Sequence, residues 1–247
     1  MDETAPAPHG RFKGLIFDVD GVLVNSPHER AWREALAPYA DPARFTTAFY
    51  QANVAGRERL EGARRTLERL GVPDAARLAP RYAAEKQALI ERLIAEGRIE
   101  GFPDALRLAA AARARGFRLA LASASRNVPA MLAHVTLPDG TPVRAAFDAD
   151  LSGAEVPRGK PDPALFLLAA AALHLPPAAC VVIEDAPAGI QAARAGGMAA
   201  LGVARLQDAA LLQAAGADLV VTSLDAVDVA ALEQGVLRVT GEGGPHA

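Results

Sequence analysis

The spacing of hydrophobic residues divides the chain into two unlike parts. Near the start, the apolar run Leu15-Ile16-Phe17 is typical of a buried strand. After residue 26, apolar side chains recur every three or four positions, which is the spacing of amphipathic helices. We expect no strand between Asn25 and Gly101. The expected helices, with breaks at 54–56 and 71–73, comprise one that begins near Pro27 and three more over residues 45–53, 57–70 and 76–96.

From residue 102 onward, short apolar runs alternate with helical patterns. This alternation favours parallel strands joined by right-handed crossovers. The expected strands cover residues 117–122, 147–151, 180–183, 199–204 and 219–221. The expected helices cover residues 104–115, 127–133, 163–173, 188–195, 208–214 and 226–232. The pattern predicts a doubly wound α/β core made of residues 1–23 and 102–247, with a helical block, 24–101, inserted after its first strand.

The composition favours a globular protein that acts on small molecules. Of the 247 residues, 51% are hydrophobic and 22% are charged, which suffices for a sizeable core. The formal net charge of −3 provides neither a basic field for nucleic acid nor a polybasic patch for a membrane surface. We therefore expect no nucleic-acid partner, no membrane partner and a small-molecule substrate. We also expect a monomer.

Cysteine usage and the first residues favour a cytoplasmic protein. The single cysteine, Cys180, excludes an internal disulfide and disfavours a structural zinc site. It lies in an apolar run, where we expect it to be buried. No stretch approaches the roughly 20 apolar residues of a membrane helix, and the first ten residues contain acids and prolines instead of a signal sequence.

Two acidic residues follow the first expected strand. If that strand continues to Asp20, the side chains of Asp18 and Asp20 leave the same face, because residues two apart in a strand point the same way. Two carboxylates so close repel each other and require a cation or a proton between them. A β-turn is the competing interpretation, in which these acids and Gly21 serve only the turn geometry.

Later segments deliver further polar side chains to the same edge of the sheet, where ligands of doubly wound folds bind. One strand leads into a run of small hydroxyl residues at a helix N-terminus, a position that favours anions. Another strand ends in two acids, and a proline-rich loop between the two strands carries a lysine. These side chains are Ser123, Lys160, Glu184 and Asp185.

This set of groups fits phosphoryl transfer. Hard oxygen ligands such as Asp18, Asp185 and a backbone carbonyl suit Mg²⁺. One carboxylate can attack phosphorus while a second gives and takes the proton, and Lys160 and Ser123 would hold the phosphoryl oxygens. Each group also has a structural interpretation, as a helix cap (the two later acids, Ser123) or a surface charge (Lys160). Their combination on successive strand ends favours the catalytic one.

Four short motifs carry these residues, in the order DVDGV, ALASAS, GKPDP and VIEDAPAGI. Together they resemble the four motifs of the haloacid dehalogenase (HAD) superfamily. The resemblance implies a Rossmann-like core with an α-helical cap inserted after the first motif, which agrees with the helical block predicted above. It also implies an enzyme.

The resemblance also implies roles for the acidic residues. It makes Asp18 the nucleophile and Asp20 the general acid/base. Mg²⁺ would be held by Asp18, the carbonyl of Asp20 and Asp185, with Glu184 as a further ligand or its support. The dehalogenase branch needs neither a second acid nor a metal, so Asp20 and the Glu184-Asp185 pair argue against that branch.

Within the superfamily, the chain is similar to the β-phosphoglucomutase-like subfamily. The segment HERAWREAL resembles its first cap helix, Gly56-x-x-Arg59 resembles its cap loop, and Ser123-Ala-Ser-Arg-Asn127 resembles its phosphate-binding loop. The match implies that His28 governs proton transfer by Asp20. It further implies that Ala124 binds substrate. Arg59 and Asn127 would bind the second phosphate of a bisphosphate intermediate. Surface charge remains the alternative for Arg59, and a partly buried polar residue for His28.

Departures from the subfamily pattern leave the substrate open. The linker between Asp20 and His28 is two residues shorter, the 135–158 loop is longer, and Ala55 and Gly62 stand where the mutases have a lysine and a serine. The sequence predicts a Mg²⁺-dependent phosphotransferase or phosphohydrolase acting on a small sugar phosphate. One alternative is a phosphatase of the same superfamily, in which water resolves the phosphoenzyme. A more distant one is a phosphate-binding module without turnover.

Overall fold

The computed structural model describes residues 11–97 and 99–241, and a parallel sheet forms its centre. Within that range, six strands pair in the order β5-β4-β1-β6-β7-β8, and every pairing is parallel. The strands are β1 (Gly14–Phe17), β4 (Arg118–Leu121), β5 (Ala149–Asp150), β6 (Cys180–Glu184), β7 (Ala199–Val203) and β8 (Leu219–Val221). The strand order reverses at β1, which confirms the predicted doubly wound, Rossmann-like α/β core.

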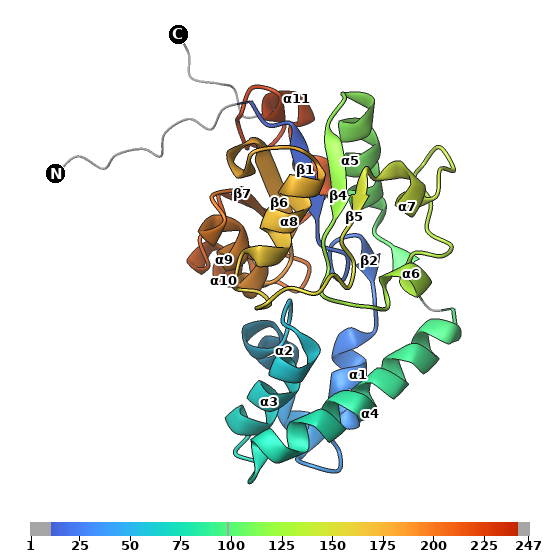
Figure 1. The fold of residues 1–247 in the computed structure, drawn as a ribbon, viewed down its shortest axis with the longest axis vertical. Coiled ribbons are helices and arrows are strands. Elements are labelled where there is room, and N and C mark those ends of the chain that lie inside the picture. Colours follow the sequence, from blue (N-terminus) through green and yellow to red (C-terminus); the bar gives the residue numbers. More distant parts are fainter. Residues whose placement is uncertain (1–10, 98, 242–247) are drawn as a thin grey trace, which may run out of the picture.

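Alternate strand residues pack against helices on opposite faces of this sheet (Figure 1). From β1, Leu15 and Phe17 point toward α5 (Pro103–Ala114), whereas Ile16 points to the other face. The helices on that other face are α8 (Ala164–Ala172), α9 (Pro187–Ala195) and α10 (Ala209–Ala214). Because both faces are covered, the strands read as continuous apolar runs. Cys180 in β6 is fully buried, as predicted.

Four helices between residues 28 and 95 form a separate layer at the carboxyl edge of the sheet, below the core in Figure 1. They are α1 (His28–Ala35), α2 (Thr47–Asn53), α3 (Arg59–Arg69) and α4 (Ala75–Ala95). This layer, called the cap below, has its own apolar core around Trp32 and Tyr82, whose ring centroids lie 5.2 Å apart. The Tyr82 hydroxyl donates to the carbonyl of Trp32 at 2.8 Å, which joins α4 to α1.

The chain passes between core and cap through a short antiparallel pair of strands. β2 (Val24–Asn25) leads out of the core and pairs with β3 (Glu100–Gly101), which leads back into it. The prediction of no strand between Asn25 and Gly101 was therefore wrong. A strand of two residues is too short to show an alternating pattern, so periodicity could not reveal it.

Other differences from the predicted elements lie at helix ends and in one long loop. The helix predicted over 45–53 begins at Thr47, because the Thr46 hydroxyl accepts a hydrogen bond from Phe49 N at 3.1 Å. The last predicted helix is split, because the Asp228 carboxylate caps a new start by accepting from Ala231 N at 3.0 Å. The short elements are η1 (Pro42–Arg44), α6 (Val128–Met131), the unpredicted α7 (Val143–Ala146), η2 (Pro177–Ala179), η3 (Leu224–Ala226) and α11 (Val229–Leu232).

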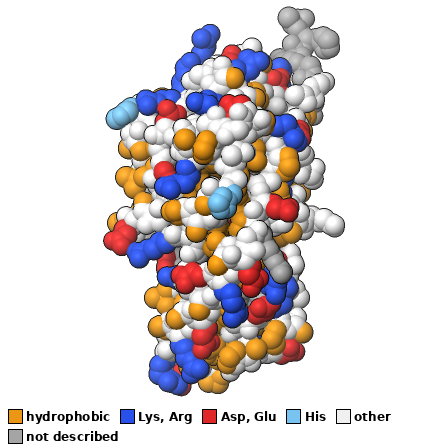
Figure 2. Space-filling view, turned by 90° about the vertical axis from the view of Figure 1, so that its right-hand side faces the viewer, with side chains coloured by type: hydrophobic (Ala, Val, Ile, Leu, Met, Phe, Trp, Pro, Cys, Tyr) orange, Lys and Arg blue, Asp and Glu red, His pale blue; other side chains and the backbone are white. Residues whose placement is uncertain are grey.

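The surface carries charges of both signs. On the face shown in Figure 2, basic side chains are interspersed with acidic ones. The arginine-rich face of α3 follows the same rule, since Arg64 pairs with Glu61 at 2.7 Å and with Glu68 at 2.6 Å. No helix of the described residues is both long enough and apolar enough to cross a membrane.

Candidate active site

β1 places Asp18 at the carboxyl edge of the sheet, between the ends of β4 and β6. The Asp18 N–H donates to the carbonyl of Ile183 at 3.0 Å, and Ala122 N donates to the carbonyl of Phe17 at 2.9 Å. Neighbouring strands on both sides therefore fix the point where the Asp18 side chain leaves the sheet. That side chain is buried, and Asp18 is only 6% exposed.

Lys160 bonds directly to Asp18. Its Nζ lies 2.5 Å from Asp18 Oδ1 and 2.5 Å from Glu184 Oε1, and 4.8 Å from the ring centroid of Phe166. The lysine is 4% exposed, which excludes the surface-charge interpretation. Burial alone would lower its pKa, but the two carboxylates raise it above the ordinary value. Lys160 is therefore a permanent ammonium beside Asp18.

Glu184 accepts a hydrogen bond from Lys160 and also fixes the backbone between β6 and α9. Its Oε2 accepts hydrogen bonds from the amides of Asp185 and Ala186, both at 3.1 Å. A Cβ at Gly189 would lie 2.0 Å from Glu184 Oε1, so glycine is required where α9 passes this carboxylate. Burial, only partly offset by the charge of Lys160, raises the pKa of Glu184 to about 7.

Asp20 connects the core to the start of the cap. The Ser26 hydroxyl donates to Asp20 Oδ1 and lies 2.9 Å from Nδ1 of His28. Burial, opposed by the Ser26 hydrogen bond and aided by the charge of Asp18, raises the pKa of Asp20 to about 7. Burial and the charges of neighbouring cations hold the pKa of His28 well below its ordinary value. Asp20 can therefore exchange a proton near neutral pH, beside a neutral imidazole.

Asp185 lies against the turn that follows Asp20. A Cβ at Gly21, which has a φ of +83°, would lie 2.0 Å from Asp185 Oδ2, so only glycine allows this approach. Burial and the charges of Glu184, Asp18 and Asp20 raise the pKa of Asp185 well above its ordinary value. A bound cation relieves such repulsion among buried carboxylates.

The donor set of this edge fits Mg²⁺. Among the described residues, no three His, Cys, Asp or Glu side chains are arranged to hold a metal by themselves. Mg²⁺, however, binds proteins through one or two carboxylates and keeps several waters. Asp18 and Asp185 can supply the carboxylates and the Asp20 turn a carbonyl, whereas Glu184 is already bonded to Lys160 and to two amides.

A cavity of about 470 Å³ separates the sheet edge from the cap. Ser123 lies at its core side, 3% exposed, and its hydroxyl accepts from Ser125 N at 3.2 Å. Of the sequence-predicted site residues, Glu184 contacts Lys160 without lining the cavity. The ones that line it are Asp18, Asp20, His28, Arg59, Ser123, Ala124, Asn127, Lys160 and Asp185.

Two predicted residues from opposite walls are joined by a glutamine that the sequence did not single out. On α4, Gln87 Oε1 accepts from Arg59 Nη1, and Gln87 Nε2 donates to Asn127 Oδ1 at 2.8 Å. Arg59 belongs to the cap and Asn127 to the core loop after β4. Gln87 thus bridges the two walls of the cavity.

Lys86 is a second cap residue that sequence reasoning missed. It is 3% exposed, lines the cavity, and lies 4.9 Å from the ring centroid of Trp32. Burial and the charge of Arg59, opposed by the charge of Asp20, lower the pKa of Lys86 to about 7. A signal was present, because Lys86 interrupts the apolar stripe of α4 between Tyr82 and Ile90.

Comparisons with known proteins agree with this geometry. Residues 12–197 match the family of haloacid dehalogenase-like hydrolases. The chain is 33% identical to the β-phosphoglucomutase of Bacillus subtilis, over 85% of this chain and 88% of that protein. It is 32% identical to the fructose-1-phosphate phosphatase YqaB of Escherichia coli, over 78% of this chain and 97% of that protein. The crystal structure of a β-phosphoglucomutase from Clostridium difficile resembles it with a TM-score of 0.73 and 28% identity, covering 91% of this chain and 96% of that one.

Proposed function

This chain is an enzyme that belongs to the haloacid dehalogenase-like hydrolases, and we propose that it is a Mg²⁺-dependent phosphotransferase of small sugar phosphates. The proposed intermediate is a phosphorylated Asp18. One observation carries the proposal, namely a buried carboxylate at a strand end, 2.5 Å from a lysine and in the same cavity as a second, proton-exchanging acid. Relatives named a phosphoglucomutase and a fructose-1-phosphate phosphatase support sugar phosphates as the substrate class.

In the first step, Asp18 attacks phosphorus. A bond forms between a carboxylate oxygen of Asp18 and the phosphorus atom, while the bond from phosphorus to the sugar oxygen breaks. Lys160 holds the Asp18 carboxylate by a hydrogen bond before the attack and can then donate to the phosphoryl oxygens. The Ser123 hydroxyl accepts a hydrogen bond from Ser125 N and lines the cavity. It is the second group that can donate to those phosphoryl oxygens.

Asp20 carries the proton in both half-reactions. In its neutral form it protonates the departing sugar oxygen, which takes the electron pair of the broken bond. As a carboxylate it then removes a proton from the hydroxyl that attacks phospho-Asp18. A pKa of about 7 places both forms within reach near neutral pH. The Ser26 hydroxyl holds the Asp20 carboxyl in position by a hydrogen bond, and the neutral His28 is hydrogen-bonded to Ser26 in turn.

Asp18, the Asp20 carbonyl and Asp185 are the groups that would hold Mg²⁺. When bound there, the ion supplies positive charge that offsets the phosphoryl group and the acidic cluster. Arg59 of the cap and Asn127 of the core loop form a donor pair for a second phosphate, and Lys86, whose pKa is about 7, adds a buried amine on the cap side. This arrangement fits a small substrate with two anionic ends.

The direct test replaces the nucleophile. Asp18→Asn keeps the shape of the side chain and removes its negative charge. We expect loss of at least about 10⁴-fold in turnover, since residual catalysis without the nucleophile rests on binding alone. We also expect no phosphoenzyme and no fluoroberyllate adduct by ¹⁹F NMR in the presence of Mg²⁺. Turnover retained in Asp18→Asn would contradict the proposal. Asp162→Asn, whose carboxylate lies in the same loop as Lys160 but pairs with Arg158, is the matched control.

Mutase and phosphatase differ in what attacks phospho-Asp18. In a mutase, a sugar hydroxyl takes the phosphoryl group, and in a phosphatase water does. β-Glucose 1-phosphate with a trace of the 1,6-bisphosphate separates the two, because glucose 6-phosphate indicates a mutase and free phosphate a phosphatase. A panel of phosphorylated sugars, fructose 1-phosphate included, then identifies the preferred substrate.

A further inference from the structure

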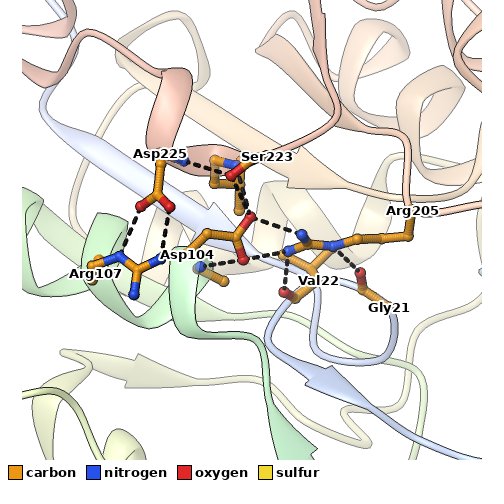
Figure 3. Close-up of polar contacts among 9 residues, drawn as sticks. Gly21, Val22, Asp104, Arg107, Arg205, Ser223 and Asp225 are labelled. Atoms are coloured by element: carbon orange, nitrogen blue, oxygen red, sulfur yellow. Dashed lines mark hydrogen bonds and ion pairs between the residues drawn. The ribbon is translucent and has the colours of Figure 1, made fainter.

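An arginine outside the cavity described above connects its own segment to two others of the core (Figure 3). Arg205 follows β7, and its guanidinium donates to both carboxylate oxygens of Asp104, at 2.7 Å and 3.0 Å. It also donates to the carbonyl of Gly21 at 3.4 Å and to the carbonyl of Val22 at 3.3 Å. The same guanidinium lies over the ring of Phe102, with its central carbon 4.0 Å from the ring centroid. One side chain therefore contacts four residues that are distant from it in sequence.

The first of these segments is the turn that carries the catalytic acid. Gly21 and Val22 directly follow Asp20, and the turn closes through Gly21 N to Val24 O at 2.9 Å and Val24 N to Val19 O at 3.0 Å. On its inner side, Gly21 touches the carboxylate of Asp185. On its outer side, two of its carbonyls accept from Arg205. A shift of this turn would move the Asp20 carboxyl and carbonyl relative to Asp185.

The second segment is the point where the chain returns from the cap. Phe102 and Asp104 lie just after β3, and Phe102 N donates to the carbonyl of Leu23 at 2.9 Å. Asp104 is 6% exposed and also accepts from Leu224 N at 2.8 Å and from the Ser223 hydroxyl at 3.2 Å. Burial alone would raise its pKa, but the hydrogen bonds from Arg205 and Leu224 hold it below its ordinary value. Asp104 is thus a fully bonded anchor for the guanidinium.

We propose that Arg205 is a positioning residue, which fixes the Asp20–Val22 turn against the Asp104 anchor and so sets the geometry of the acid/base and of the Mg²⁺ ligands. The proposal rests on the proposed function for its catalytic readout. Arg205 itself does not touch the phosphoryl group, because it lines a separate cavity of about 240 Å³ on the other side of Asp20 and Asp185. Its effect passes through the two carbonyls.

Lysine cannot replace this arginine. A lysine at position 205 keeps one positive charge for Asp104, but it has no planar fork to bond the carboxylate twice, reach two carbonyls and stack on Phe102. Arg205→Lys therefore separates the charge from the geometry. The matched control is Arg107→Lys. Arg107, which lies on α5 like Asp104, forms an equally bidentate pair with Asp225, at 2.8 Å and 2.6 Å, but does not contact the turn (Figure 3).

The experiment measures kcat, KM, adduct formation and hydrogen exchange in wild type, Arg205→Lys and Arg107→Lys. For Arg205→Lys we expect kcat to fall about 10- to 100-fold with KM within about threefold, the usual loss when a group that orients metal ligands is removed. We expect the fluoroberyllate adduct to require about tenfold more Mg²⁺. We also expect faster amide exchange over residues 19–25, whereas Arg107→Lys should match wild type in all four measurements.

Two results would overturn the role of Arg205. One is wild-type amide exchange over residues 19–25 in Arg205→Lys, and the other is a fall in its melting temperature with kcat and the Mg²⁺ requirement unchanged, which would indicate a purely structural residue. The exchange measurement needs no substrate. If wild type turned over no sugar phosphate, the proposed function would fail, while exchange in Arg205→Lys would still decide whether Arg205 holds the turn.

Discussion

The two walls of the cavity are built differently. On the core wall, Lys160 bonds to Asp18 and Glu184 at 2.5 Å each, and these side chains are at most 8% exposed. On the cap wall, Arg59 donates to Gln87, and Gln87 donates to Asn127 of the core loop, through hydrogen bonds that are exposed or only partly buried. The core wall is therefore complete without a substrate, whereas the contacts of the cap wall are of a kind that water or a substrate can replace.

This difference predicts different roles for the two walls of the cavity. Removing one partner of a buried charge pair leaves an uncompensated charge and is costly, whereas an exposed hydrogen bond or ion pair contributes little. Substitutions in the core wall should therefore act on kcat and on stability. Substitutions in the cap wall should act on KM and on the choice of substrate.

Among the tests of this contrast between the walls, the largest effect is expected for Lys160→Met. The substitution leaves Asp18 and Glu184 without their shared cation and removes the donor that we propose for the phosphoryl oxygens. We expect kcat to fall about 10³-fold with KM changed by less than about threefold, as for loss of a preorganised donor to the transition state. Steady-state kinetics with saturating Mg²⁺ measure both. Lys13→Met, an exposed lysine just before β1, should retain wild-type kcat. A kcat within tenfold of wild type in Lys160→Met would remove the contrast between the walls.

Lys86→Met tests the cap wall. Among the described cap residues, Lys86 is the one basic side chain that is buried. Lys86 lines the cavity near Asp20 and Arg59, and with a pKa of about 7 it can carry a proton toward an anionic substrate near neutral pH. We expect KM to rise about 10- to 30-fold, with kcat changed by less than about threefold, for loss of a charge-assisted contact of about 2 kcal/mol. Arg81→Met, an exposed residue of the same helix, is the control. A fall confined to kcat would instead place Lys86 in the chemistry.

The same contrast explains what could be predicted from the sequence. Asp18, Ser123 and Asp185 follow apolar runs, and the rule that ligands meet strand ends brings them together without knowledge of the structure. Arg205 also follows a predicted strand, but no motif accompanies it, so the sequence alone does not mark it as a site residue. Its partner Asp104 lies on a helix more than 100 residues away, and only the fold shows that the two meet.

The cap residues were harder to predict, because helical spacing reports which face is buried but not what that face opposes. Lys86 could have been noticed as a charge within an apolar stripe. Gln87 gave no such signal, since a glutamine beside that stripe is typical of a solvated face. The short strands β2 and β3 were missed for a related reason, since their pairing joins residues about 75 positions apart and depends on tertiary structure.

The acidic core wall should also make stability depend on pH. The pKa of Asp20 is raised from 3.8 to about 7 and that of Glu184 from 4.5 to about 7, so the folded protein retains protons that the unfolded chain has released. The free energy of unfolding should therefore fall as pH rises from about 4.5 to 7, by at most about 1.4 kcal/mol per pH unit for each group. Urea unfolding in chelator measures this slope.

Mg²⁺ and one substitution provide the controls for that slope. Mg²⁺ bound by Asp18 and Asp185 would add positive charge beside Asp20 and Glu184 and lower the pKa of both, so excess Mg²⁺ should flatten the dependence on pH. Glu184→Gln should remove one of the two contributions and flatten it in part. An equal slope with and without Mg²⁺ would mean that the acidic cluster and the metal site are not the same group of residues.

The smallest effect is expected at Gln87, whose amide occupies Arg59 and Asn127 when no substrate is bound. Because a substrate phosphate has to displace this amide, Gln87→Ala should lower KM by about two- to threefold, the scale of a partly exposed hydrogen bond. Gln87→Glu should do the reverse, since a carboxylate holds Arg59 more strongly and repels a phosphate. KM for each variant, measured with sugars carrying one or two phosphates, should separate most for the bisphosphate. If both variants raise KM alike, Gln87 binds the substrate itself, and the cap wall is then as preformed as the core wall.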